Sequence, residues 1–160
     1  MTGFVMSRTK NVWYGFALQG YMGGGEKELY MQLTMTTDYA LRCLLYLAGK
    51  EGVSSSPEIG KTVGINNIFV QKVLRVLRDA GFVSSLQGGT GGYRLAKKPE
   101  EIVLLDIILL FEKTMKINRC LEAEGCCERC ETCPMHVYYA EVQNSLEGYF
   151  GQYTLQDVIN

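Results

Sequence analysis

Hydrophobic side chains recur with a helical period from about residue 36 onward. Spacings of i, i+3, i+4 and i+7 place side chains on one face of an α-helix. The apolar face predicted in this way consists of Leu41, Leu44, Leu45 and Ala48. Thr36 or Thr37 can cap the N-terminus, and the helix should end near Gly49. Cys43 lies inside it, away from the other cysteines, and is expected to be a small buried hydrophobe.

Two shorter amphipathic helices follow. Serines at 54–56 precede Pro57, an arrangement typical of a helix start, and Gly64 should end this helix. A second start at Asn66 or Asn67 opens the next helix, whose apolar positions have the same spacing as those of the first. The side chains predicted to be buried on the two helices are Ile59, Val63, Val70, Val73, Leu74 and Leu77.

The opposite side of the third helix carries amide and basic groups. Its members are Asn67, Gln71, Lys72, Arg75 and Arg78. Two short helices joined through a glycine turn, the second with such a face, form a helix-turn-helix whose second helix can enter the DNA major groove. Gln71 and Lys72 suit base edges, and Arg75 and Arg78 suit phosphates or the acidic groups of neighbouring helices. Helix pairs of this kind also occur in proteins that never contact DNA.

Gly81 ends the third helix and opens a predicted β-hairpin. Strand-like runs at 81–86 and 93–95 flank a tip, residues 87–92, in which four glycines surround Thr90. Glycine lets the tip backbone approach a ligand closely, and after a helix-turn-helix such a hairpin is typical of a DNA-binding wing. The wing residues predicted to contact DNA are Gly88, Gly89, Thr90, Gly91 and Arg94. The alternative is an ordinary hairpin with a loose turn.

Charge is unevenly distributed along the 160 residues, whose formal net charge is −1. Residues 31–98 carry nine Lys or Arg and four Asp or Glu, whereas residues 99–160 carry four and eleven. A basic front half is expected where one face meets a polyanion, although chance segregation also produces such an asymmetry. No apolar stretch approaches the roughly twenty residues of a membrane helix. We therefore expect a cytoplasmic protein without a membrane partner.

Five cysteines and the one histidine of the chain crowd into residues 120–136. They are Cys120, Cys126, Cys127, Cys130, Cys133 and His136. Thiolates and an imidazole suit zinc or an iron–sulfur cluster, and a reducing cytosol favours metal binding or redox sensing over structural disulfides. The spacing of Cys130 and Cys133 also has the form of a Cys-x-x-Cys redox motif. No nucleotide loop, nucleophile–base pair or paired carboxylates indicate an enzyme or a small-molecule substrate.

A long apolar helix is predicted to begin at Pro134, directly after the last cysteine. Its apolar positions are Met135, Tyr138, Tyr139, Val142, Leu146, Tyr149 and Phe150. A helix this apolar needs a partner, which is either a second copy of the chain in a homodimer or the core of its own subunit. Cys133 and His136 lie near its N-terminus, where the helix dipole favours thiolates.

Residues 1–30 show no sustained period, and we assign them no fold. Glycine, glutamate and lysine have purine-rich codons, so residues 23–28 would be encoded by a purine-rich tract just upstream of Met31, as in a translated ribosome-binding site. We expect the natural start at Met31, which N-terminal sequencing of the native protein would test. The domains are then a leader, 1–30, a winged helix-turn-helix, 31–98, and a segment, 99–160, with a linker helix, a cysteine-rich loop and a dimerisation helix.

Several segments together resemble one known family. They are residues 31–34, 38–42, 88–96, 99–102 and 153–157. From about residue 31 the chain is similar to the IscR/NsrR-type (Rrf-two) family of winged helix-turn-helix transcription regulators. The resemblance implies a homodimer that binds a [2Fe–2S] or [4Fe–4S] cluster through three cysteines and one further ligand.

The resemblance also implies particular ligands. The three cluster cysteines it assigns are Cys120, Cys127 and Cys133. Cys126 is the alternative to Cys127, because each preserves one of the two family spacings. The fourth ligand is His136 if the chain follows the cluster-assembly regulators, and Asp38 if it follows the nitric-oxide sensors. Cys130 has no counterpart in the family pattern and leaves room for a different ligand set.

Three residues depart from the family pattern at the DNA-binding elements. Ile68 and Phe69 stand where small polar and aromatic residues are more usual, and Gln87 stands where the wing often has arginine. These differences leave the operator sequence open.

The sequence as a whole predicts a mainly α fold with a small β-hairpin wing and a long C-terminal dimerisation helix. The predicted function is a homodimeric regulator that binds a double-stranded DNA operator under the control of an iron–sulfur cluster. A zinc-controlled or thiol-switched regulator of the same fold is the alternative, and a small redox or electron-transfer protein is a further one.

Overall fold

The computed structural model describes residues 33–159 apart from 90, 113 and 123–127. The expectations for the leader 1–30, for Thr90 and for Cys126 and Cys127 concern residues outside this part of the chain. None of the helices in the described ranges is both long enough and apolar enough to cross a membrane.

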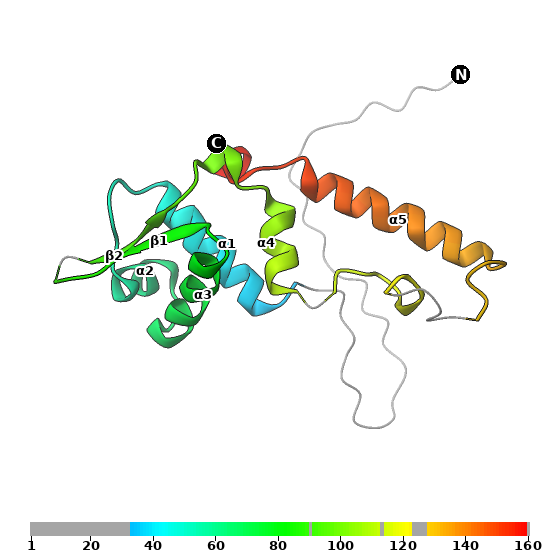
Figure 1. Cartoon of the computed structure of the whole chain (residues 1–160), viewed down its shortest axis with the longest axis horizontal. Coiled ribbons are helices and arrows are strands. Elements are labelled where there is room, and N and C mark those ends of the chain that lie inside the picture. The colour runs from blue at the N-terminus through cyan, green and yellow to red at the C-terminus, as the bar shows by residue number, and fades with distance from the viewer. Residues whose placement is uncertain (1–32, 90, 113, 123–127, 160) are drawn as a thin grey trace, which may run out of the picture. The chain divides into compact units, whose positions relative to one another are not determined.

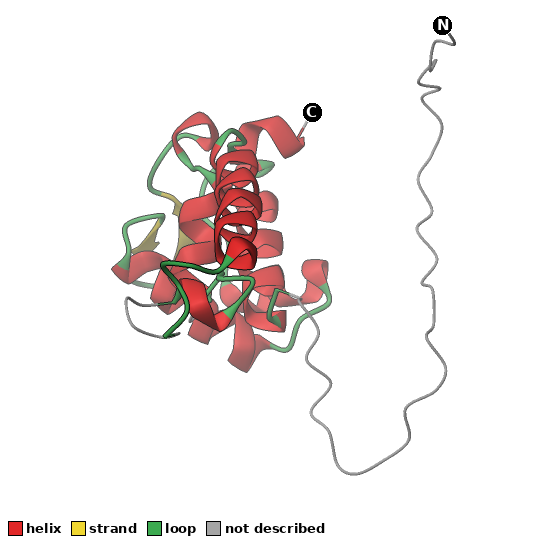
Figure 2. Ribbon diagram, turned by 90° about the vertical axis from the view of Figure 1, so that its right-hand side faces the viewer, coloured by secondary structure: helices red, strands yellow, loops and turns green. Residues whose placement is uncertain are grey.

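The described residues form a mainly helical fold with one small hairpin, as the sequence predicted (Figure 1). Its elements are α1 (Met35–Ala48), α2 (Ser56–Val63), α3 (Asn67–Asp79), β1 (Val83–Leu86), β2 (Gly92–Leu95), η1 (Pro99–Glu101), α4 (Leu104–Phe111), η2 (Arg119–Leu121), α5 (Pro134–Gly151) and α6 (Leu155–Ile159). Strand structure in these ranges is confined to β1 and β2 (Figure 2).

Helix α1 differs from its prediction at the N-terminus and on its buried face. Thr34, and not Thr36 or Thr37, caps the helix by accepting a hydrogen bond from the backbone N–H of Thr37. The side chains buried on α1 are Thr37, Ala40, Cys43, Leu44 and Leu47. Leu45, predicted to be buried, is 36% exposed. Small side chains at 40 and 43 let α3 and α4 pack closely, so the buried face is rotated from the one that leucines alone suggested.

Helices α2 and α3 form the expected pair. Ser55 caps α2, which begins one residue before Pro57, and Gly64 adopts a left-handed backbone with φ of 71° in the turn. The side chain of Asn66 accepts a 2.9 Å hydrogen bond from the N–H of Ile68 and so caps α3. The buried residues of α3 are Val70, Val73, Leu74 and Leu77, which confirms the predicted face.

The hairpin is held to the helical layer by the loop before α2. Strands β1 and β2 pair antiparallel, with Val83 opposite Leu95. Ser54 exchanges two backbone hydrogen bonds with Tyr93, of 2.9 and 2.8 Å. A Cβ at Gly92 would lie 2.5 Å from the carbonyl oxygen of Ser54, so this close approach requires glycine.

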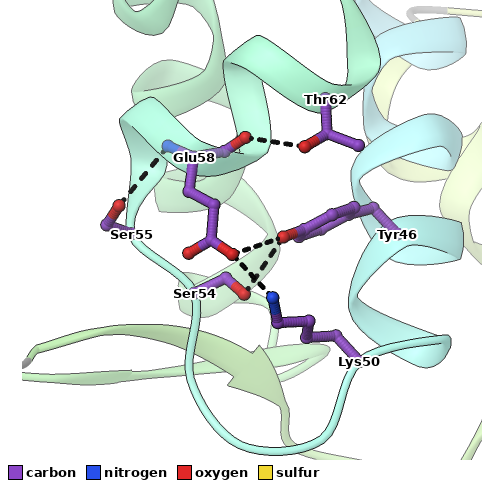
Figure 3. A network of polar contacts seen from close by, with 6 residues as sticks. All are labelled: Tyr46, Lys50, Ser54, Ser55, Glu58 and Thr62. Carbon is purple, nitrogen blue, oxygen red and sulfur yellow. Dashed lines mark hydrogen bonds and ion pairs between the residues drawn. The ribbon is translucent and has the colours of Figure 1, made fainter.

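A polar network reinforces the same junction (Figure 3). The carboxylate of Glu58 accepts hydrogen bonds from the Tyr46 hydroxyl at 2.9 Å and from Lys50 Nζ at 2.7 Å. The Tyr46 hydroxyl also lies 3.4 Å from Ser54 Oγ. The hydrogen bond from Lys50 is the main reason that the pKa of Glu58 lies below its usual range. The network therefore connects the end of α1, helix α2 and the loop residue that pairs with β2.

The C-terminal residues return to the linker before α4. Leu155 donates a 2.8 Å hydrogen bond to the carbonyl of Ile102, and Leu104 donates one of 2.9 Å to that of Tyr153. Ile102, Ile107 and Leu155 are fully buried against the core formed by α1 and α3. Both ends of the segment that contains the cysteines and α5 are thus attached to the helix-turn-helix core.

Candidate DNA-binding face and cysteine site

One stripe of α3 faces away from the core. It consists of Ile68, Gln71, Lys72 and Arg75, at positions i, i+3, i+4 and i+7, and all four residues are exposed. Two of the predicted DNA-contacting residues, Lys72 and Arg75, therefore present their charges on the same side of the helix.

The other polar residues of α3 are more constrained. The Gln71 amide donates a 3.3 Å hydrogen bond to Ser56 Oγ of α2. Arg78 is paired with Asp79 at 2.7 Å, so its charge is already partly compensated. Asn67 is half-buried, and its Oδ1 has no hydrogen-bond partner among the described residues. A buried amide oxygen without a partner is costly, which marks Asn67 as a position with unused hydrogen-bonding capacity.

Lys72 and Phe69 form a cation–π pair in the first turns of α3. The Lys72 Nζ lies 5.6 Å from the centroid of the Phe69 ring. The same ring meets Tyr39 of α1 edge to face, with centroids 6.3 Å apart. These contacts hold the lysine ammonium beside the first turns of α3.

The hairpin presents a glycine-rich tip, as predicted. Gly88 and Gly89 are exposed, and the N–H of Gly91 donates a 2.9 Å hydrogen bond to the carbonyl of Gly88. Gly88 has a φ of 117°, a backbone conformation that favours glycine. Arg94 is exposed on β2, and its Nε lies 3.3 Å from Ser84 Oγ on the paired strand. The described residues of the hairpin thus provide one exposed cation and accessible backbone at the tip.

Residues 112–133, which precede α5, are called the cysteine segment. This segment is attached to α5 before the chain reaches Cys120. The backbone N–H of Ile117 donates a 2.9 Å hydrogen bond to Gln143 Oε1, and Gln143 is 2% exposed. Lys116 and Gln143 both donate 2.8 Å hydrogen bonds to one carboxylate oxygen of Glu147. The hydrogen bond from Lys116 is the main reason that the pKa of Glu147 is lowered.

The segment then runs beside α5 toward its N-terminus, and η2 packs against the helix (Figure 1). Asn118 is extended, and the short helix η2, which begins at Arg119 and contains Cys120, contacts α5. The attachment at Gln143 and the contact of η2 therefore keep Cys120 beside α5.

The N-terminus of α5 carries two of the predicted ligands. Cys133 is its N-cap residue, and the backbone N–H of His136 donates a 3.0 Å hydrogen bond to the carbonyl of Cys133. Both side chains are half-buried, as are those of Cys120 and Cys130. The Nδ1 atom of His136 is buried and has no hydrogen-bond partner among the described residues. An imidazole nitrogen in this condition is suited to bind a metal ion.

The described residues do not by themselves assemble a metal site. Within those ranges, no three of the Cys, His, Asp and Glu side chains lie close enough together to hold an ion. Asp38, the competing fourth ligand, pairs with Arg42 at 2.9 Å on the exposed surface of α1. Cys43 is fully buried, as predicted, and burial raises its pKa to about 12, which makes it a poor ligand or nucleophile.

Glu112 is a connecting residue that the sequence did not reveal. It follows α4 at the start of the cysteine segment, and it accepts a 2.7 Å hydrogen bond from the backbone N–H of Thr34. The Thr37 hydroxyl donates to the same carboxylate oxygen. The contact joins residues more than seventy positions apart, and a negative charge at a helix N-terminus is favourable. Glu112 therefore links the cysteine segment directly to the first turn of α1.

Comparison with known proteins decides the family. A model of the Rrf2 family, described as an iron-dependent transcriptional regulator, matches residues 33–160. The chain belongs to the Rrf2 family. Members of the Rrf2 family are transcriptional regulators and not enzymes, which confirms that part of the sequence prediction.

Individual Rrf2 relatives support the assignment. The transcriptional regulator NsrR of Shouchella clausii is 33% identical over 132 residues, which cover 81% of this chain and 89% of that protein. The solved structure of T. potens IscR matches with a TM-score of 0.64 and 26% identity, covering 80% of this chain and 85% of that one. CymR, the global cysteine regulator of B. subtilis, matches with a TM-score of 0.65 and 26% identity, covering 80% and 95%.

Proposed function

We propose that this Rrf2 protein is a homodimeric regulator whose affinity for a DNA operator is set by an iron–sulfur cluster bound between residues 120 and 136. The observation that carries the proposal is at the N-terminus of α5. There a cysteine caps the helix, and one turn later a buried imidazole nitrogen has no protein partner in the described ranges. The similarity to IscR and NsrR supports the same assignment.

The donor set fits a cluster in its chemistry. The ligands we propose are Cys120, Cys127, Cys133 and His136. Cys126 replaces Cys127 in the alternative set, and His136 is preferred to Asp38 because the aspartate is paired with Arg42. When bound, an iron–sulfur cluster supplies a redox-active centre whose properties depend on its ligands and on solvent access.

A homodimer would cover the apolar stripe of α5. Met135, Tyr138 and Tyr149 are exposed on this helix, and Val142 is half-buried. The four positions repeat at i, i+3, i+7 and i+14, so they share one side of the helix. A second copy of the chain packed there would set the distance between two α3 helices on the operator.

The coupling between the two regions is proposed to pass through Gln143 and Glu112. Gln143 fixes the cysteine segment to α5, and Glu112 fixes the start of that segment to α1. Helices α1–α3 with β1 and β2 form the winged unit. Ligation at residues 120–136 would therefore favour one placement of the winged unit relative to α5. A coupling of a few kcal/mol, the usual range, changes operator affinity roughly 5- to 150-fold.

A visible absorption spectrum of protein purified without oxygen tests the cluster. We expect a coloured protein with bands that are lost in Cys120→Ser and Cys133→Ser and changed in His136→Ala. Cys43→Ala is the matched control, because that thiol is buried in the core, and it should keep the bands. A colourless protein containing stoichiometric zinc would reject the iron–sulfur proposal.

Charge removal on α3 tests the DNA-binding face. Lys72→Ala and Arg75→Ala should weaken binding to duplex DNA and lower its salt dependence by about one unit of the log–log slope each. Arg78→Ala is the matched control, since its charge is paired with Asp79, and its effect should be smaller. Unchanged affinity in all three variants would show that α3 is not the recognition helix.

Analytical ultracentrifugation tests the dimer. Tyr138→Asp places a charge on the apolar stripe and should raise the dissociation constant at least tenfold. Asn144→Asp adds the same charge six residues further, on another side of α5, and should leave the constant unchanged. Equal behaviour of the two variants would argue against this stripe as the interface.

A thiol switch is the second candidate, favoured by one specific observation. Cys130 and Cys133 are both half-buried and are separated by two residues immediately before α5. Oxidation of these thiols to a disulfide, with transfer of two electrons to an oxidant such as a peroxide, would change the start of α5 without a metal. In that case Cys130→Ser, but not Cys120→Ser, should remove the response of DNA binding to oxidant.

A further inference from the structure

Ile68 is an apolar side chain in an otherwise polar and basic stripe. It shares one side of α3 with Gln71, Lys72 and Arg75, and it is 63% exposed. No large hydrophobic side chain in the described ranges is more exposed. Its N–H is held by the Asn66 cap, which places the side chain on the first turn of the helix. In a helix-turn-helix, the first turns of the second helix meet the base edges.

The neighbouring aromatic residue has a structural role that Ile68 does not share. Phe69 is exposed as well, but its ring contacts Tyr39 edge to face and has the Lys72 ammonium over it. The Gln71 amide, which would otherwise be the first base-reading group on the stripe, donates to Ser56. At the leading end of the stripe, Ile68 is therefore the side chain best placed for a direct contact with a base.

The DNA major groove offers one apolar group at its base edges, the C5 methyl group of thymine. Lys72 and Arg75 on the same stripe provide charges that complement the flanking phosphates, which makes duplex DNA the fitting occupant. We propose that Ile68 is a specificity-determining residue that packs against one thymine methyl group in each operator half-site. This inference rests on the proposed DNA-binding function.

Replacement of thymine by uracil tests it, since uracil lacks only the methyl group. The probe is a duplex selected from a random-sequence pool by the full-length protein purified without oxygen. Each thymine is then replaced singly, and the dissociation constants of wild type and Ile68→Ser are measured. At one thymine in each half-site, the replacement should weaken wild-type binding about 4-fold, which corresponds to about 0.8 kcal/mol, the value for burying one methylene-sized group.

Binding by Ile68→Ser should not change when uracil replaces thymine at that position, and it should change as wild-type binding does at the other positions. Ile68→Val, which keeps an apolar surface, should retain most of the sensitivity. Val76→Ser is the matched control, because Val76 is an exposed apolar residue about 12 Å further along the same helix, and it should respond as wild type does.

Two results would overturn the inference while leaving DNA binding intact. One is a wild-type protein that binds a selected duplex but tolerates uracil at every position. The other is that each uracil replacement changes the dissociation constants of wild type and Ile68→Ser by the same factor. If the pool yields no duplex bound above the non-specific level, the proposed DNA-binding function fails, and this inference fails with it.

Discussion

The winged unit, together with α4, and the region from 112 to 151, which contains the cysteine segment and α5, differ sharply in the number of side chains that are buried. The fully buried hydrophobic side chains of the described ranges lie between residues 40 and 108, with Leu155 as the exception. From 112 to 151, Gln143 is the one buried residue in those ranges, while several large side chains of α5 are exposed. The first region has a core of its own. The second depends on contacts with a neighbouring element, a ligand or another molecule, and few buried apolar contacts are typical of regions of low local stability.

The largest effect should come from the core of the winged unit. Leu74→Ala removes a fully buried side chain between α3 and α1 and should destabilise the protein by about 2–5 kcal/mol. Urea unfolding followed by circular dichroism measures it. Leu109→Ala, at an exposed position of α4, should change stability by no more than about 0.5 kcal/mol. Similar losses in the two variants would remove the contrast between buried and exposed positions.

A smaller and more local effect is expected at Gln143. Gln143→Leu leaves the N–H of Ile117 and the carboxylate of Glu147 with one partner fewer, at a cost of about 1–3 kcal/mol. Hydrogen exchange should accelerate at residues 116–121 while α3 keeps its protection. Gln152→Leu, an exposed substitution at the end of the same helix, should alter neither region. Faster exchange across α3 in Gln143→Leu would show that the two regions unfold together.

The same contrast separates what the sequence predicted from what it did not. The buried face of α3 was predicted in full, because its apolar positions alternate with charged ones at a helical spacing. In α1 the residues around Leu45 are apolar on several sides of the helix, so the periodicity did not identify which side is buried. The buried side is the one that carries the small residues Ala40 and Cys43. The start of α5 at Pro134 was predicted correctly, because a helix start is a local signal.

The connecting residues were not predictable in this way. Gln143 is a polar residue within an apolar helix, and its burial depends on where a segment 26 positions earlier returns. Glu112 contacts a threonine 78 positions earlier, and nothing in its immediate sequence distinguishes it from a solvated glutamate. The ligand set of the cysteine segment stays a prediction, since Cys126 and Cys127 lie outside the described residues.

Glu112 provides a test of the connection between the two regions. Glu112→Ala removes the acceptor for the Thr34 N–H and the Thr37 hydroxyl, which should cost about 1 kcal/mol. It should also reduce the difference in operator affinity that we propose between protein with a bound cluster and protein from which a chelator has removed the cluster. Glu51→Ala, an exposed acid beyond the end of α1, should preserve that difference. An undiminished difference in Glu112→Ala would place the coupling elsewhere.

The smallest effect on stability is expected at the junction of α1, α2 and the hairpin. The direction of its pH dependence follows from the charges of Glu58 and Lys50. Hydrogen bonding to Lys50 lowers the pKa of Glu58, so the stabilisation is present above the unfolded value of about 4.3 and is lost as pH falls through the lowered folded value. The same contact raises the pKa of Lys50, so stabilisation is present below the unfolded value of about 10.4 and is lost as pH rises through the raised one.

Glu58→Gln should therefore lower the melting temperature slightly at neutral pH, and the difference from wild type should shrink below about pH 4 and above about pH 10.4. Thermal melts across this range measure the difference. Because the pair is exposed, a molar concentration of salt should reduce it as well. A difference that does not vary with pH or salt would mean that Glu58 stabilises the junction through packing with Tyr46, and the hairpin would then be held by the same apolar contacts as the core.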